Sequence, residues 1–320
     1  MTLERRGAAC LLGALVGDAA SLGLHWIYAV GRIADVVKEH GGFVAFTPID
    51  EAHYAGVSSY FAHGARRDGM LSQYGESLRV MVQSMNETNR SFDTEAFQKK
   101  YCEVFGLGGT YQGYVDRPTL GTVNNIINEV TEPSGVDDTQ LPAIVRLPAL
   151  LAANGGAQNL EAETRDAVRV TNNNEFAVEC GNVFAGLLRQ VLRGDDVTDA
   201  IEAAANSATG EFGEGLRTAI TTTQKDSVVF GEETGRACQL AQAMPLCFHI
   251  LKHSSSYRDA IETNILAGGD SCGRAIVIGA VMAAKYGIAT ENGVPLSWVL
   301  STADAAALWE EAKKLSGDTA

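Results

Sequence analysis

Residues 264–287 read Asn-Ile-Leu-Ala-Gly-Gly-Asp-Ser-Cys-Gly-Arg-Ala-Ile-Val-Ile-Gly-Ala-Val-Met-Ala-Ala-Lys-Tyr-Gly, and this stretch decides the fold class expected for the chain. Its first glycine pair permits backbone angles that other residues resist, so Asp270 or Ser271 can cap a helix that begins there. From 275 to 284 nearly every side chain is apolar or small, which predicts a helix buried on most sides. Gly287 is a typical C-terminal stop.

Four polar residues cluster at the first turn of this predicted helix: Asp270, Ser271, Cys272 and Arg274. Free amide groups and the helix dipole favour negative charge at such a place, which suits an anionic ligand. The alternative is that Asp270 serves only as the N-cap of the helix.

The N-terminal segment 4–23 predicts a second core helix, rich in Ala, Leu and Gly. Gly13 and Gly17 lie one turn apart, so another helix can pack closely against them. Asp18 falls in apolar surroundings, where an unpaired carboxylate is costly. It either bonds to backbone amides as a structural residue or faces a cavity.

His25 and Trp26 follow this helix directly, and His25 has two interpretations. A histidine beside aromatic rings is either a satisfied core residue or a catalytic acid or base. Between these segments, residues 40–70 and 106–122 are rich in glycine and lack periodicity, which predicts long loops; long loops in compact domains are often functional.

The rest of the chain shows helical spacing. Helices are expected after Ser72, whose hydroxyl is a suitable cap, and then over 92–105, 124–130, 144–153, 161–170, 175–192, 197–219, 236–253, 257–265, 295–300 and 303–315, with 220–235 irregular. No stretch alternates apolar and polar residues long enough to require a sheet. The sequence therefore predicts an all-α fold, a compact single domain over residues 1–320.

The charge balance excludes some partners. The formal net charge is -14 at pH 7, whereas nucleic acids and anionic membranes are bound by clustered positive charge. Six cysteines are scattered singly, which indicates buried thiols in a reducing compartment and a cytoplasmic protein. Arg5 and Arg6 precede an apolar run shaped like a signal peptide, but Asp18 interrupts it; no membrane span is expected.

Asp137 and Asp138 form an acidic pair just before the predicted helix that contains Arg146. A hard cation such as magnesium would suit two neighbouring carboxylates. The alternative is a solvated turn with an N-cap.

Two segments carry a family resemblance. Gly-Asp-Ala at 17–19, within the run 13–19, and Leu-Ala-Gly-Gly-Asp-Ser at 266–271 resemble the first and last signature segments of the ADP-ribosylglycohydrolase family. The resemblance covers most of the chain. It implies a compact helical fold, hydrolysis of an ADP-ribosyl linkage, ADP-ribose or an ADP-ribosylated substrate as partner, and two magnesium ions among acidic residues.

This chain departs from the family where the metal ligands are expected. Ser-Gln-Tyr-Gly at 72–75 stands where the family has Ser or Thr, two aspartates and Thr; Cys272 stands where the family has its second late aspartate. His25 replaces a glutamate found in many members. Softer or neutral side chains should lower the affinity for magnesium, leaving a weakened or partial site. The run 17–28 is similar to the branch containing the J-type crystallins and selenoprotein J.

Three functions follow from this resemblance. In the first, the chain is a glycohydrolase in which Asp270, with Asp137 or Asp138, holds magnesium and positions a water molecule. In the second, it is a metal-free enzyme with His25 as acid or base near Cys272. In the third, it is a non-catalytic ADP-ribose-binding protein or a crystallin-like structural protein.

The resemblance also implies residues for substrate binding. Arg274 and the helix end would meet the diphosphate, and Trp26 or Tyr74 would stack on adenine. The full expected substrate-binding set is Asp18, Trp26, Ser72, Gln73, Tyr74, Asp138, Arg146, Ser271 and Arg274.

Overall fold

The computed structural model describes residues 1–154, 160–224 and 226–319, and within these ranges the chain is helical, with isolated bridges but no β-strand. The all-α prediction is confirmed. The helices are α1 Leu3–Ser21, α2 Val30–Glu39, α3 Gln73–Glu87, α4 Thr94–Phe105, α5 Arg117–Ile127, α6 Leu147–Asn154, α7 Leu160–Arg169, α8 Glu175–Arg193, α9 Val197–Ser207, α10 Gly210–Thr221, α11 Ser227–Thr234, α12 Leu240–His253, α13 Tyr257–Leu266, α14 Ser271–Tyr286, α15 Leu296–Ser301 and α16 Ala305–Ser316, with short 3-10 turns at 22–24, 51–54 and 141–143.

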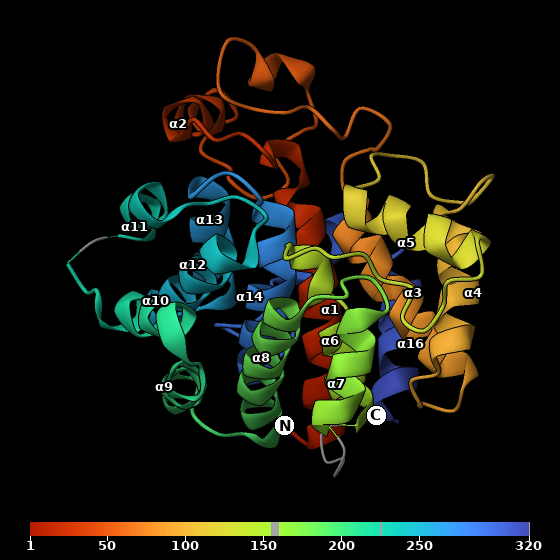
Figure 1. Cartoon of the computed structure of the whole chain (residues 1–320). Helices are drawn as coiled ribbons and strands as arrows, with labels where there is room; N and C mark the ends of the chain where they lie inside the picture. The colour runs from red at the N-terminus through yellow and green to blue at the C-terminus, as the bar shows by residue number, and fades with distance from the viewer. Residues whose placement is uncertain (155–159, 225, 320) are drawn as a thin grey trace.

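The helices α1 and α14 form the centre of the molecule and run antiparallel (Figure 1). Small residues let their backbones approach: a Cβ added to Gly13 would lie 2.2 Å from the Ala283 Cβ and 2.9 Å from the Gly279 oxygen. Both predicted core helices, and the predicted stop at Gly287, are therefore confirmed.

The other helices surround this pair (Figure 1). α8 to α12 lie on one side of it and α3, α4, α5 and α16 on the other. Leu3–Leu24 is long and apolar enough to cross a membrane by length and composition alone, yet its most apolar window is wholly buried inside the protein. Its hydrophobicity is accounted for by its place in the core.

Two segments predicted as irregular contain helices. α5 begins at Arg117, because Asp116 accepts a hydrogen bond from the Thr119 amide and Pro118 occupies the first turn, where its missing N–H costs nothing. α11 begins after Asp226, which caps the Val229 amide. In both cases the prediction missed an aspartate cap.

Two further boundaries differ from the prediction. The expected helix over 197–219 is two helices, α9 and α10, separated at 208–209. α2, between Val30 and Glu39, was not predicted at all.

The segment 40–70 is mostly irregular, as expected, and crosses one end of the central pair (Figure 1). That end is where α1 finishes and α14 begins. The Trp26 amide donates to the Gly269 carbonyl, 2.8 Å away, and the Tyr60 amide donates to the Trp26 carbonyl, 3.0 Å away. These bonds hold the long loop over the start of α14.

Candidate active site

Asp270 caps the start of α14 and is fully buried. Its Oδ1 accepts from the Gly273 amide at 3.2 Å, and its Oδ2 accepts from the Tyr74 hydroxyl at 2.7 Å. Burial raises the pKa of Asp270 to about 6, although the Tyr74 hydrogen bond and the charge of Arg274 act in the opposite direction. The carboxyl group can therefore gain and lose a proton near neutral pH.

His25, also fully buried, lies beside this carboxyl group. Its Nδ1 accepts a hydrogen bond from the Cys272 amide at 3.0 Å, so the ring proton is on Nε2. Nε2 is 3.7 Å from Asp270 Oδ1 and has no hydrogen-bond partner. Burial lowers the pKa of His25 well below its usual value, with a further lowering from His63 and Arg274, so the imidazole is neutral.

Cys272 is in the first turn of α14, with its thiol 3.6 Å from the Asp18 carbonyl oxygen. Burial raises the pKa of Cys272 well above its ordinary value, and the charges of Asp18 and Asp270 raise it further. Burial raises the pKa of the Cys272 thiol by more than the helix N-terminus lowers it, so the thiol keeps its proton.

Asp18 joins the end of α1 to the start of α3. Its two oxygens accept from the amide and the hydroxyl of Ser72, and the Ser72 hydroxyl also caps the Tyr74 amide. A Cβ added to Gly75 would lie 2.2 Å from Asp18 Oδ2, so glycine is required there. Burial raises the pKa of Asp18 to about 7 despite the two Ser72 hydrogen bonds.

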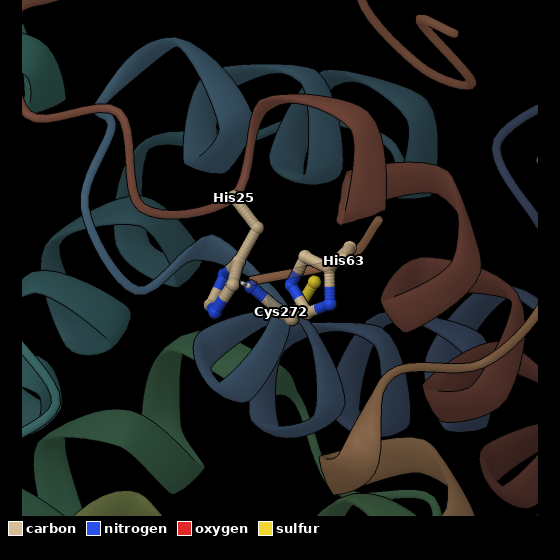
Figure 2. Close-up of side chains that lie close together, drawn as sticks. All are labelled: His25, His63 and Cys272. Atoms are coloured by element: carbon tan, nitrogen blue, oxygen red, sulfur yellow. Dashed lines mark hydrogen bonds between the residues drawn. The ribbon is translucent and has the colours of Figure 1, made fainter. Parts of the chain in front are cut away.

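His63 comes from the long loop and lies next to His25 and Cys272 (Figure 2). The His25 and His63 ring centres are 5.1 Å apart. His63 is buried, and neither of its ring nitrogens has a hydrogen-bond partner. We refer to His25, His63, Tyr74, Asp270 and Cys272 as the buried cluster.

Three aromatic rings lie beside this cluster and are partly open to solvent. Trp26 stacks on His63 at 6.1 Å and meets Tyr114 edge-on at 5.0 Å; Tyr60, 54% exposed, is 5.7 Å from both Trp26 and Tyr114. Trp26 has a φ of 64°, an unusual backbone conformation for a bulky side chain. We call Trp26, Tyr60 and Tyr114 the aromatic surface.

The other predicted acidic residues have separate partners. Asp137 is exposed and accepts from the Asn174 side chain at 2.7 Å. Asp138 accepts from the Gln140 amide and from the Asn172 side chain. Among the described residues, the carboxylate oxygens of Asp137, Asp138 and Asp270 do not all lie within 4.8 Å of one another.

The two predicted arginines are fully buried and bonded to the protein. Arg146 donates to the carbonyls of Pro142 and Ala167 and to the Thr171 hydroxyl. Arg274 donates to the Asn264 side chain and to carbonyls at 236 and 268. These bonds fix loops around the start of α14 and around α6.

The side chain of Gln73 is hydrogen-bonded within the protein, whereas that of Ser271 is not. Gln73 donates to the Thr119 hydroxyl and accepts from the Asp116 amide, so it fixes the start of α5. The Ser271 hydroxyl is buried without a hydrogen-bond partner.

Sequence reasoning did not single out His63, Asp116 or the rings of Tyr60 and Tyr114. His63 lies in a loop without periodicity, so nothing local indicated that it turns inward. Asp116 had a usable signal, because Asp-Arg-Pro at 116–118 is typical of a helix start. One oxygen of Asp116 is buried without a hydrogen-bond partner.

The residues present do not fit a pair of magnesium ions. Magnesium prefers carboxylate, carbonyl and water oxygens, but the three side chains whose ligand atoms all lie within 4.8 Å of one another are two imidazoles and a thiol. Both oxygens of Asp18 are bonded to Ser72, and both of Asp270 accept hydrogen bonds as well.

Comparisons with known proteins agree along the whole chain. A family profile described as ADP-ribosylglycohydrolase matches residues 1–320. Crystallin J1A of Tripedalia cystophora is 24% identical over 323 residues, covering 97% of this chain and 96% of that protein. Crystallin J1B of the same organism is 24% identical over 313 residues, covering 94% and 92%.

One solved structure gives the same fold. A chain described as an ADP-ribosylglycohydrolase-related protein complex superposes with a TM-score of 0.70 and 16% identity, and the match covers 99% of both chains. At this identity the likeness concerns the fold alone.

Proposed function

This chain belongs to the ADP-ribosylglycohydrolase family, and from that premise we propose that it hydrolyses an ADP-ribosyl glycosidic bond with Asp270 as its acid–base group. One observation carries the proposal: a buried carboxyl group held by Tyr74 and Gly273 has an unpartnered His25 N–H 3.7 Å away. Buried polar groups without partners are uncommon in proteins and mark places where a ligand or water is expected.

The chemistry needs one group that moves a proton. In the hydrolysis, the Asp270 carboxylate takes a proton from water while the hydroxyl oxygen bonds to the anomeric carbon. The bond from that carbon to the leaving nitrogen or oxygen breaks, and the leaving atom receives a proton in return. Because its pKa is about 6, Asp270 can serve first as base and then as acid.

His25 has a positioning role in this scheme. Its ring is neutral, and Nε2–H lies 3.7 Å from Asp270 Oδ1, which also accepts from the Gly273 amide at 3.2 Å. A donor at that place keeps one carboxylate oxygen oriented while the other exchanges the proton. The Cys272 amide fixes the tautomer by donating to Nδ1.

The aromatic surface supplies a place for the adenine base. Trp26, Tyr60 and Tyr114 are partly open to solvent and adjoin the buried cluster through His63. Stacking on such rings contributes about 1–3 kcal/mol per base. Tyr74 cannot share this role as it stands, because its ring is buried and its hydroxyl is bonded to Asp270.

A second candidate is a non-catalytic role, as a pseudoenzyme or a crystallin-like structural protein. Its supporting observation is that the side chains of His25, Asp270 and Cys272 have no exposure to solvent. The two relatives named crystallins, matched over nearly their full length, are consistent with it.

The test is release of free ADP-ribose from a panel of N-linked and O-linked ADP-ribosylated peptides, followed by chromatography. The wild type should release ADP-ribose from at least one linkage class, and Asp270→Asn should lose the activity while keeping the wild-type melting temperature. An unchanged rate in Asp270→Asn excludes the role given to Asp270. No release from any linkage favours the non-catalytic candidate.

A further inference from the structure

We propose that His25, His63 and Cys272 form a binding site for a thiol-preferring divalent transition metal, with zinc as the ion that fits these donors best. One ligand atom from each residue lies within 4.8 Å of the other two, and all three residues are buried (Figure 2). The proposal does not depend on the proposed hydrolysis, since it concerns binding of an ion.

His63 is buried without a hydrogen-bond partner for its ring. A buried imidazole normally bonds through at least one of its nitrogens, but both nitrogens of His63 have no partner. The ring faces Cys272 and His25 rather than solvent (Figure 2). A metal ion would satisfy one of these nitrogens.

The three donor groups are of the kinds that zinc prefers. Two imidazole nitrogens and one thiol are typical zinc ligands, with zinc–nitrogen distances of about 2.0–2.1 Å and a zinc–sulfur distance of about 2.3 Å. Tetrahedral ligands at these lengths lie about 3.5 Å from one another, so the three side chains must close inward by about an ångström. His63 is on an irregular loop, where such a shift disturbs no helix.

His25 has a carboxyl group beside one of its two ring nitrogens. Its Nε2 is on the side of Asp270 Oδ1, at 3.7 Å, which leaves Nδ1 as the metal ligand. Metal-bound histidines usually have a carboxylate or carbonyl at their second nitrogen, as Asp270 is placed here. On binding, the ion replaces the Cys272 amide at Nδ1 and the thiol loses its proton.

Charge also favours a cation. The Asp18 and Asp270 carboxyl groups are close enough to influence the Cys272 thiol electrostatically. A zinc ion with one thiolate and two neutral imidazoles has a single net positive charge, which one neighbouring carboxylate would balance. Three protein ligands leave a fourth position for water or another small ligand.

The experiment measures zinc directly. The full-length protein is incubated with zinc, freed of loosely bound ion by gel filtration and analysed by mass spectrometry for metal content. We expect one zinc per chain. Cys272→Ala and His63→Ala should weaken the affinity by more than about 100-fold, beyond the 10–100-fold typical for losing a residue that only supports a ligand.

The controls are cysteine and histidine substitutions elsewhere: Cys180→Ala on α8 and His253→Ala at the end of α12. Both should retain one zinc per chain. Cobalt in place of zinc gives a second readout, because a thiolate ligand produces a charge-transfer band that Cys272→Ala should abolish. His63 lies outside the helical core, and circular dichroism checks that the His63→Ala protein folds.

Two results would overturn the proposal. The first is a zinc content near zero in the wild type after gel filtration. The second is zinc binding that is reduced no more by Cys272→Ala and His63→Ala than by the two control substitutions. The zinc would then be bound at the surface. Neither result bears on whether ADP-ribose is released, so the failure of this proposal is distinguishable from failure of the proposed function.

Discussion

The main-chain N–H of Cys272 donates to Nδ1 of His25 at 3.0 Å, across 247 positions of sequence. An amide in the first turn of α14, one of the free donors of that helix end, is therefore used by an imidazole rather than by an anion. The bond ties the segment after α1 to the start of α14 and fixes the histidine tautomer. It makes the two ends of the chain parts of one site.

The aromatic surface gives a prediction on ligand affinity. Trp26→Ala and Tyr60→Ala should each weaken ADP-ribose binding by about 5- to 150-fold, because each removes a ring worth about 1–3 kcal/mol of stacking. Isothermal titration calorimetry measures the dissociation constants. Phe43, 75% exposed and outside the aromatic surface, is the matched control. Equal affinities for Trp26→Ala and Phe43→Ala would exclude stacking at this place.

The central helix pair gives a prediction on stability. Gly13→Ala should lower the free energy of unfolding by about 1–3 kcal/mol, because the new methyl group would be 2.2 Å from the Ala283 Cβ. Gly186→Ala on α8, where a Cβ meets nothing within 4 Å, should instead be stabilising by about 0.4–1 kcal/mol. Urea denaturation measures both. A Gly13→Ala protein as stable as the Gly186 variant would contradict the close packing of α1 on α14.

Cys272 should be unreactive in the folded protein. Its thiol is fully buried, and burial raises its pKa well above the usual value, so iodoacetamide should not modify it until the protein unfolds. Cys102, which is partly exposed, should react first. Peptide mass spectrometry after timed alkylation measures both sites. Rapid modification of Cys272 in the native state would support the hypothesis of a nucleophilic cysteine instead.

His249 should make stability depend on pH. Its Nε2–H donates to the Thr222 carbonyl and its Nδ1 accepts from the Ser227 hydroxyl, an arrangement only the neutral ring can make. Burial, more than the charge of His253, lowers the pKa of His249 to about 4. Between pH 6.5 and 4 the unfolded chain therefore binds more protons than the folded one, and stability falls as the pH falls.

The size of this effect can be bounded. Because of His249, the free energy of unfolding should fall by up to about 1.4 kcal/mol for each pH unit by which the pH is lowered in that window. The contribution is absent in His249→Gln, so the free energies of unfolding of the two proteins should converge as the pH is lowered from 6.5 to 4. Parallel curves for the two proteins would contradict it.

Much of the fold could be predicted from local sequence. The helices α1 and α14 have almost no polar face, which indicates a core position, and capping residues at Ser72 and Asp270 mark two helix starts correctly. One of the errors came at a short helix. α11 spans only Ser227–Thr234, too short for a clear period, and its aspartate cap was overlooked among threonines and glycines.

The candidate site could be predicted only in part. Asp270, His25 and Cys272 were recognised because they adjoin the two core helices, and the structure brings them together. His63 could not be found in this way, since its position depends on how a loop without periodicity folds back over α14. The partners of Arg274 could not be predicted either, because they are the Asn264 side chain and backbone carbonyls of other segments.

The most direct test of the role given to Asp270 is the rate of ADP-ribose release by the wild type and Asp270→Asn, each with and without added magnesium. We expect a wild-type rate that magnesium leaves unchanged, and loss of that rate in Asp270→Asn with folding retained. Release by the wild type only when magnesium is present, or equal rates in the two proteins, would contradict it.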